Sequence, residues 1–297
     1  MPDIFVVFTD QIPLSRGLGR RRAHRKGTCI MDLNTITDVR LARSRADLVA
    51  LCTTVVPLAG GSALFGEPQN HLEGFVDLMT LEWPALTVTP DGLDIAATCT
   101  IAELSRFPAQ PGWLAHPAFF QCCTALFGSF KVWNVATVGG NLCASLPAGP
   151  MTSLTAALDG EVLIWSPDGS ERRMPVTSFI TGNTTNILTP GEVLRSIHLP
   201  LRALEARVGY RKIALSPLGR SGAVLLGRLE RSGAFVLTVT AATVKPVQLS
   251  YDALPDADTL RADVERLDEW FTDAHGAADW RRAVSCVLAD EIREELA

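Results

Sequence analysis

The spacing of apolar and polar residues predicts short strands and helices in alternation. Apolar runs at 55–58 and 75–78 are typical of short strands. Strand pairs at 86–95 and 161–176 are each interrupted by an Asp-Gly turn, which predicts two β-hairpins. Three further stretches are predicted to be helical, over 42–51, 112–127 and 152–158.

The pattern changes near residue 203, after a strand-like run at 193–199. Three β-rich runs follow, and the chain from about residue 256 onward predicts two helices. We therefore expect an α+β protein with one domain at 31–202. A C-terminal α+β domain at 203–297 would contain a three-stranded antiparallel sheet and helices.

Composition agrees with a folded protein and narrows its class. The chain has 297 residues, of which 47% are hydrophobic and 20% are charged, so it can bury a substantial core. It contains no uninterrupted run of 18 apolar residues, so we expect no membrane span. A net charge of -5 gives no reason to expect nucleic acid as a partner.

The cysteines point to a reducing compartment. There are seven, an odd number, and no C-x2-C pair gives the spacing of a zinc or iron–sulfur site. Reduced thiols and the lack of a recognisable export signal predict a cytoplasmic protein and no bound metal.

The first 30 residues differ from the rest in charge. They carry a formal charge of +4, whereas the remaining 267 residues carry -9. The basic run at 20–26 favours a disordered N-terminal extension over a partner-binding arm.

Two glycine-rich segments form the candidate ligand-binding site. Glycine lets backbone N–H groups converge on a small anion without a side chain in the way. Neither segment matches G-x-G-x-x-G or G-x-x-x-x-G-K-[ST], which disfavours a nicotinamide-dinucleotide fold and a P-loop. Either segment by itself is compatible with a phosphate cradle or with a tight turn. The first, which follows a strand, comprises Leu58, Ala59, Gly60, Gly61, Ser62, Ala63 and Leu64. The second, expected to be extended, comprises Thr137, Val138, Gly139, Gly140 and Asn141.

In this order the two segments resemble the FAD-binding subunits of molybdenum hydroxylases. That family includes the medium subunit of carbon monoxide dehydrogenase and the flavin domain of xanthine dehydrogenase. The resemblance covers roughly residues 31–290. It is strongest at PLAGGSAL (57–64), FVDL (75–78), NVATVGGN (134–141) and LTPGEVL (188–194).

The resemblance implies a fold and a site. The fold would be that of p-cresol methylhydroxylase and vanillyl-alcohol oxidase, with two α/β subdomains that bind FAD. The segments 59–63 and 137–141 would enclose the diphosphate of FAD. Leu194 would lie near the isoalloxazine ring and Lys212 would approach it, although from its pattern alone Leu194 is an ordinary core residue of a strand.

Two positions depart from the family pattern. Trp133 stands where an arginine is common, and Pro150 stands where an aspartate that helps to hold the cofactor is expected. Ser145 could supply a substitute hydroxyl. No histidine lies in a segment that resembles a covalent flavin attachment site, so we expect non-covalent FAD.

The resemblance also implies an electron-transfer role in a heteromeric enzyme. A large partner subunit would hold the molybdenum cofactor, and a small partner would carry two [2Fe-2S] clusters, in a dimer of heterotrimers. No residue of this chain would then be catalytic in substrate oxidation. Two alternatives stay open: a stand-alone flavin oxidoreductase of the same fold, and a non-catalytic assembly subunit that has lost FAD.

Overall fold

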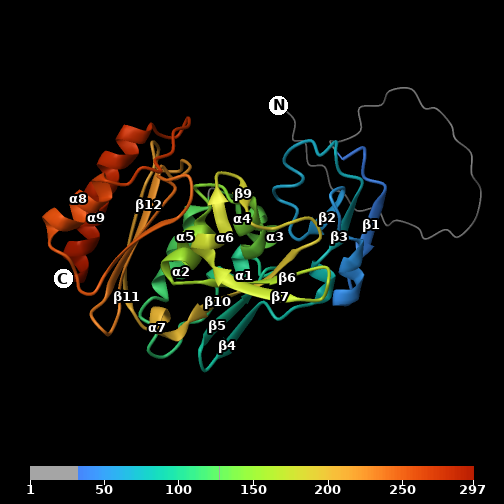
Figure 1. Cartoon of the computed structure of the whole chain (residues 1–297), viewed down its shortest axis with the longest axis horizontal. Coiled ribbons are helices and arrows are strands. Elements are labelled where there is room, and N and C mark those ends of the chain that lie inside the picture. Colours follow the sequence, from blue (N-terminus) through green and yellow to red (C-terminus); the bar gives the residue numbers. More distant parts are fainter. Residues whose placement is uncertain (1–32, 127) are drawn as a thin grey trace, which may run out of the picture. The chain divides into compact units, whose positions relative to one another are not determined.

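The structure, a computed structural model, describes residues 33–126 and 128–297, which belong to one compact unit (Figure 1). The predicted extension at 1–30 lies outside the described residues. The described residues form a mixed α/β fold built on three main sheets, with a two-stranded ribbon of β8 (Ile180–Gly182) and β9 (Thr185–Asn186). No helix among them has both the length and the apolar character needed to cross a bilayer.

The first sheet is small and parallel, with the strand order β1-β3-β2. Its strands are β1 (Asp38–Leu41), β2 (Val55–Leu58) and β3 (Gly74–Asp77). Both apolar runs predicted as strands are confirmed within a residue or so. The helix predicted at 42–51 is instead a 3-10 helix, Arg45–Ala50, held by a capping box between Ser44 and Asp47. Only Leu48 of this helix is buried, too little apolar surface to stabilise a longer one.

The second sheet is antiparallel and has the order β4-β5-β10-β6-β7. Its two outer pairs are the predicted hairpins, which are confirmed. Its strands are β4 (Leu86–Thr89), β5 (Gly92–Ala96), β6 (Glu161–Trp165), β7 (Glu171–Pro175) and β10 (Val193–Pro200). The short helices that accompany it are α1 (Ile101–Ser105), α2 (Pro117–Ala125), α3 (Phe130–Val135), α4 (Val138–Ala144), α5 (Pro150–Ala157), α6 (Val176–Phe179) and α7 (Leu201–Leu204).

The helix predicted over 112–127 is shorter in the structure, since α2 begins at Pro117. Proline suits the first turn of a helix, because its missing N–H would be unpaired there in any case.

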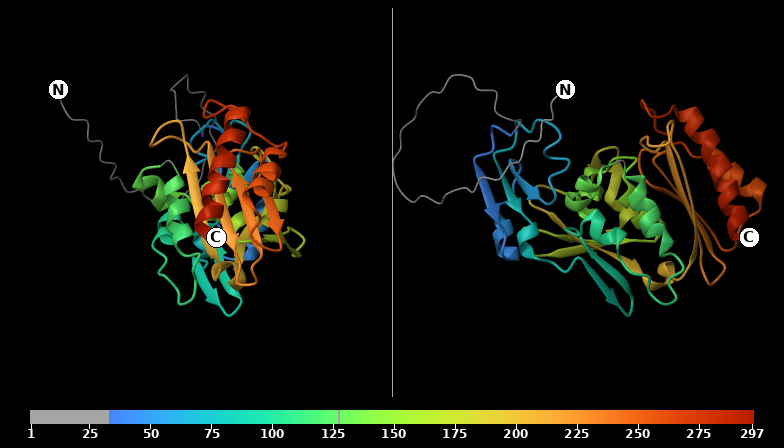
Figure 2. Two further views of the ribbon diagram at one scale, coloured as in Figure 1. Left: turned by 90° about the vertical axis from the view of Figure 1, so that its left-hand side faces the viewer. Right: turned by 180° about the vertical axis from the view of Figure 1, so that it is seen from behind.

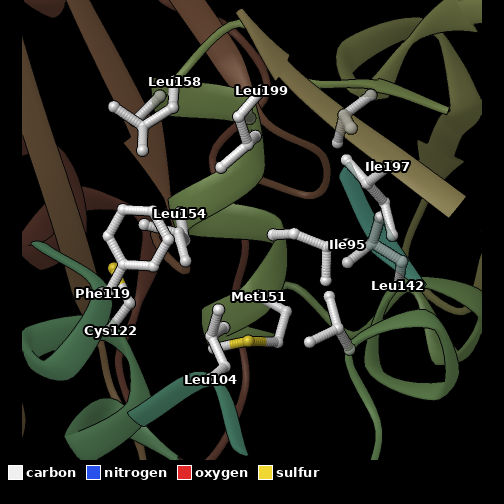
Figure 3. Close-up of a cluster of buried hydrophobic side chains, with 14 of the residues drawn as sticks. Ile95, Leu104, Phe119, Cys122, Leu142, Met151, Leu154, Leu158, Ile197 and Leu199 are labelled. Atoms are coloured by element: carbon white, nitrogen blue, oxygen red, sulfur yellow. The ribbon is translucent and has the colours of Figure 1, made fainter. Parts of the chain in front are cut away.

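One apolar core joins the second sheet to these helices. Every residue of α5 is buried, because the helix packs against α2 and α4 as well as two strands of the third sheet. Figure 3 shows part of this core, where side chains from α2, α4, α5, β5 and β10 meet, among them Phe119, Leu142, Met151, Ile95 and Ile197. The segment after the second glycine loop is therefore fixed by packing on several sides.

The third sheet is antiparallel and has four strands in chain order, which corrects the prediction of three. The strand that was missed is β14, which is short, carries polar Gln248 and Ser250, and follows a proline. Its pattern alone does not distinguish it from a loop, and its pairing with β13 creates it. The strands are β11 (Arg207–Ile213), β12 (Ala223–Leu229), β13 (Phe235–Thr240) and β14 (Val247–Tyr251).

The two predicted C-terminal helices are confirmed as α8 (Ala257–Glu265) and α9 (Ala278–Leu296). Helix α9 packs on β11 and β12, and α8 packs on α9, as both views in Figure 2 show. A Cβ atom on Gly227 of β12 would lie 2.3 Å from the Ile292 side chain, so glycine is required for this close packing. The helix therefore lies directly on the backbone of the sheet.

A buried arginine ties the third sheet to the core helices. Arg228 on β12 is 2% exposed and donates a hydrogen bond of 2.8 Å to the carbonyl of Ala157, at the end of α5. Its guanidinium also lies 3.0 Å from Glu230 and 3.3 Å from Asp159. Arg202 pairs with the same two carboxylates, so the buried charges are balanced within a four-residue network.

Replacing Arg228 with methionine should lower the free energy of unfolding by about 2 kcal/mol, since one cation of the network and its bond to α5 are lost. Arg231→Met is the matched control, because Arg231 pairs with Glu205 on the surface and has a 67% exposed side chain. Its effect should stay within about 0.5 kcal/mol. Urea unfolding measures both, and equal effects would contradict the role of the network.

The same network predicts a pH dependence. Burial acts to raise the pKa of Asp159, but hydrogen bonding from Arg202 and the charge of Arg228 outweigh it and hold the pKa below its usual value. This stabilisation is fully present above the unfolded pKa of about 4 and is lost as the pH falls through the lowered folded value. The stability difference between wild type and Arg228→Met should therefore shrink below about pH 4. A difference that stays constant under urea titration down to about pH 3 would contradict this assignment.

Candidate functional site

The first glycine loop leaves the carboxyl end of β2 with its donors unused. Gly61 adopts a φ of 67°, which favours glycine, and its carbonyl accepts a hydrogen bond of 2.8 Å from the N–H of Phe65. Within the described part of the chain, no backbone carbonyl accepts a hydrogen bond from the N–H groups of residues 60–64. Donors that lack partners inside the protein are free to bind a ligand or water.

The second glycine loop differs from its predicted extended form, because it begins helix α4. Thr137 is the N-cap, and its Oγ1 accepts a hydrogen bond of 3.0 Å from the N–H of Gly140. Two other N–H groups of this loop donate to backbone carbonyls. The N–H of Val138 donates to Cys99 at 2.8 Å, and the N–H of Gly139 donates to Ala97 at 2.9 Å. The N–H groups that the prediction offered to a phosphate are thus already paired within the protein.

The paired glycines of this loop serve two different purposes. A Cβ atom on Gly139 would lie 2.4 Å from the Cβ of Ala97, so this glycine is needed for packing α4 against the backbone after β5. Gly140 is exposed, and a Cβ there would meet only Thr137 Oγ1, at 2.8 Å. Gly139 therefore supports the loop, and Gly140 keeps its outer surface open.

The side chains of the second loop supply its remaining donors. The amide of Asn141 is oriented because its Oδ1 accepts a hydrogen bond of 3.0 Å from the N–H of Met151, which leaves the NH2 group as a donor. The hydroxyl of Thr137 accepts from Gly140 and keeps its own hydrogen to donate. This loop therefore offers a hydroxyl and an amide rather than a row of backbone N–H groups.

The structure brings the two loops together. A Cβ atom on Gly60 would lie 1.6 Å from the carbonyl oxygen of Val135, the last residue of α3. The backbone of the first loop thus lies directly on the backbone that leads into the second loop. Sequence analysis did not find this contact, since nothing in the pattern around Val135 distinguishes it from other helical residues.

Three other predicted site residues lie apart from this contact. Ser145 is buried and already hydrogen-bonded, donating to the carbonyl of Leu142 at 2.8 Å and accepting from Asn186 Nδ2 at 3.2 Å. Leu194 is 3% exposed in the core on β10, a strand that packs against α4. Lys212 lies on β11, in another sheet, opposite Val224.

The two residues that depart from the family pattern, Trp133 and Pro150, both pack against other parts of the protein. Trp133 on α3 is half-buried and lies edge-on to Phe120, with ring centroids 6.4 Å apart. Its indole N–H has no hydrogen-bond partner among the described residues. Pro150 is buried as the first residue of α5, where its fixed φ favours the helix.

Near the contact of the two loops lie the backbone N–H groups of residues 60–64, which donate to no backbone carbonyl of the described residues, and the hydroxyl and amide of the second loop. A family model described as "FAD binding domain in molybdopterin dehydrogenase" matches residues 33–202, which is more than half of the chain. The chain therefore belongs to this family of FAD-binding domains.

The chain is also similar to individual proteins. A putative xanthine dehydrogenase FAD-binding subunit, XdhB, from Escherichia coli K12 is 31% identical over 148 residues, or 48% of this chain and 49% of that protein. The glyceraldehyde dehydrogenase medium chain of Sulfolobus acidocaldarius is 24% identical over 48% of this chain and 47% of its own length. The chain thus spans about half the length of these relatives.

Solved structures match over a longer range. A chain of CO dehydrogenase from Oligotropha carboxidovorans has a TM-score of 0.76 at 22% identity and covers 88% of this chain and 98% of its own. A chain of quinoline 2-oxidoreductase from Pseudomonas putida 86 has a TM-score of 0.73 at 18% identity and covers 87% and 95%. At these identities the matches show the fold alone, and they confirm the expected mixed α/β architecture.

Gly60→Ala should separate the two loops, because no conformation of the adjacent backbone admits a methyl group 1.6 Å from the Val135 oxygen. We expect a loss of about 1–3 kcal/mol in the free energy of unfolding, typical of overpacking. Gly66→Ala on the same loop is the control, since its Cβ would find its nearest neighbour at 3.4 Å. If thermal unfolding showed the two variants to be equally stable, the loop contact would be wrong.

Proposed function

We propose that this chain is the FAD-binding electron-transfer subunit of a heteromeric molybdenum-containing hydroxylase or dehydrogenase. One observation supports it most strongly. Among the described residues, no backbone carbonyl accepts a hydrogen bond from the N–H groups of residues 60–64, and Gly60 lies against the backbone that leads into the second glycine loop, in a chain of this FAD-binding family. Electrons would reach FAD from [2Fe-2S] clusters of a small partner and leave to a final acceptor.

The residues of the two loops fit the diphosphate of FAD. A diphosphate presents several acceptor oxygens in a small volume and requires converging donors. The first loop would provide backbone N–H groups and the Ser62 hydroxyl, and the second would provide the side chains of Thr137 and Asn141. The glycines at 60, 61 and 140 leave the approach unobstructed. We propose that FAD is held by these contacts without a covalent bond.

The chain's own contribution would be to bind and orient the cofactor. FAD supplies the redox chemistry, and the protein positions and tunes it. The carboxylates nearest the motifs already have structural partners: Glu192 pairs with Arg172 at 2.6 Å, and Asp77 accepts a hydrogen bond from the N–H of Met79 at 2.8 Å. Burial acts to raise the pKa of Glu192, but hydrogen bonds from Arg172, Thr189 and Ser166 together outweigh it and hold the pKa below its usual value. Neither carboxylate is therefore offered as a general acid or base.

The names of the relatives support a role within a complex. One is called an FAD-binding subunit and another a medium chain, which are names of parts of larger enzymes. We propose a small partner with two [2Fe-2S] clusters and a large partner with the molybdenum cofactor, assembled as a dimer of heterotrimers. Substrate oxidation would take place on the large partner.

Isolation of the complex from cells that produce this chain tests the function. The isolated complex should contain flavin, molybdenum and two additional polypeptides, and it should show the absorbance of iron–sulfur clusters. A single chain that oxidises a substrate unaided would support a stand-alone flavin oxidoreductase of the same fold. Isolation of the chain with partners but without flavin absorbance would support an assembly subunit that has lost FAD.

Gly140→Leu should weaken FAD binding at least tenfold without unfolding the chain, since its side chain would occupy the open side of the second loop. The fold should tolerate it because the only close neighbour is Thr137 Oγ1. The same substitution at Gly66, which is also exposed, is the matched control. Flavin fluorescence measures the affinity and thermal unfolding checks the fold. Unchanged FAD content in Gly140→Leu would contradict the placement of the second loop.

A further inference from the structure

Strand β1 is an outer strand of the first sheet, and its apolar side chains are exposed (Figure 1). Within residues 33–126 and 128–297 it pairs with β3 alone. The side chain of Val39 is 56% exposed and that of Leu41 is 52% exposed. The unpaired edge of a strand presents a row of backbone donors and acceptors, to which another strand can add.

The other outer strands of the three main sheets carry features that oppose such pairing. Proline cannot donate to a ladder, and it lies within, beside or at the end of four of them. Charged side chains also discourage pairing, and the fifth strand contains three cations. The residues are Pro57 in β2, Pro84 and Pro90 on either side of β4, Pro175 in β7, Pro246 before β14, and Arg207, Arg211 and Lys212 in β11. Strand β1 has no proline within it or beside it.

The two charges of β1 have opposite signs and lie on one face of the strand. Asp38 and Arg40 are two residues apart, so their side chains project from the same face, and they form an ion pair of 2.6 Å. The Arg40 side chain is 55% exposed and that of Asp38 is 45% exposed, and neither forms another ion pair within the described residues. The strand is therefore neutral and does not repel a second copy of itself.

A two-fold axis at Val39 makes the strand complementary to itself. In antiparallel pairing about this axis, Val39 lies opposite Val39 of the second copy, and Asp38 lies opposite Arg40. Opposite charges that face each other across a strand pair stabilise it, and like charges destabilise it. An axis at residue 38 or 40 would pair like charges, and an axis between two residues would place each charge opposite an uncharged side chain. The sequence of β1 thus selects one register, and a second copy supplies its complement.

We propose that β1 is a self-association surface, through which two copies of this chain join their first sheets edge to edge. The two three-stranded sheets become one six-stranded sheet with the order β2-β3-β1-β1-β3-β2, in which the two β1 strands are antiparallel. Burial of Val39 and Leu41 favours the contact, because both now expose apolar surface to water. No cofactor takes part, so the inference goes beyond the proposed function and is tested apart from it.

The shortness of the contact determines its strength. Strand β1 has four residues, so the new ladder contains few hydrogen bonds and buries less area than a permanent dimer requires. We therefore expect a reversible dimer, whose fraction rises with protein concentration.

Sedimentation velocity of the full chain at increasing concentrations tests the association. Wild type should form a dimer, and Val39→Lys should raise its dissociation constant about tenfold, because two like charges then meet at the axis. Val88→Lys is the matched control, since Val88 is 49% exposed on the outer strand β4. The control should leave the dissociation constant unchanged, and thermal unfolding checks that both variants fold.

Exchange of the two charges tests the register. Asp38→Arg and Arg40→Asp should each raise the dissociation constant about tenfold, because identical copies of either variant place like charges opposite each other. An equimolar mixture of the two variants restores opposite charges across the axis and should associate at least as strongly as wild type. The double variant Asp38→Arg/Arg40→Asp should also associate with itself as wild type does.

The outcomes separate this inference from the proposed function. If wild type stays monomeric at every concentration, another segment or partner covers β1 and the inference is overturned. If Val39→Lys dimerises as well as Val88→Lys, the contact lies elsewhere and the inference is also overturned. It fails equally if neither the mixture nor the double variant regains the dimer. A chain that dimerises as expected but binds no FAD would overturn the proposed function and leave this inference standing.

Discussion

The candidate site depends on the contact of two stretches of backbone at Gly60. The carbonyl of Val135 occupies the space that any side chain at residue 60 would need. This contact holds the end of a parallel strand against the start of α4, although about 75 residues separate them in the chain. The contact is with the carbonyl of Val135, and no backbone carbonyl of the described residues accepts a hydrogen bond from the N–H groups of residues 60–64.

The two loops look equivalent in sequence and play unequal parts. Among the described residues, no backbone carbonyl accepts from the N–H groups of residues 60–64 in the first loop, whereas the second loop uses three of its own to bond the backbone at residues 97 and 99 and the Thr137 cap. The second loop thereby becomes a rigid support, and it presents side-chain donors instead. In a site of this kind the first loop adapts to the ligand and the second loop stays fixed. This arrangement suits a flexible molecule that is held at one point.

Local rules explain which features the sequence predicts. The hairpins, the glycine pairs and the two C-terminal helices follow from turn chemistry and periodicity, and all of them are present. Helix α4 was predicted as extended because Gly139 and Gly140 are poor helix formers. Its packing on Ala97 outweighs that propensity, and this packing is a long-range contact that no local pattern contains.

The same limit applies to β14 and to a cavity of about 260 Å³ near the carboxyl end of α4. The strand exists because β13 lies beside it, and Val247–Tyr251 alone is as polar as many loops. The residues that line the cavity come from positions 146–281, and their spacing carries no motif. Ser221 becomes conspicuous only once its surroundings show that it has no partner.

The position of Arg281 near the carboxyl end has a consequence for biosynthesis. Its guanidinium donates to carbonyls from residues 222, 241 and 276, so these three segments are held together only when α9 is present. The ribosome synthesises this helix after both glycine loops. Any ligand held by these segments would therefore be captured only after α9 has been synthesised.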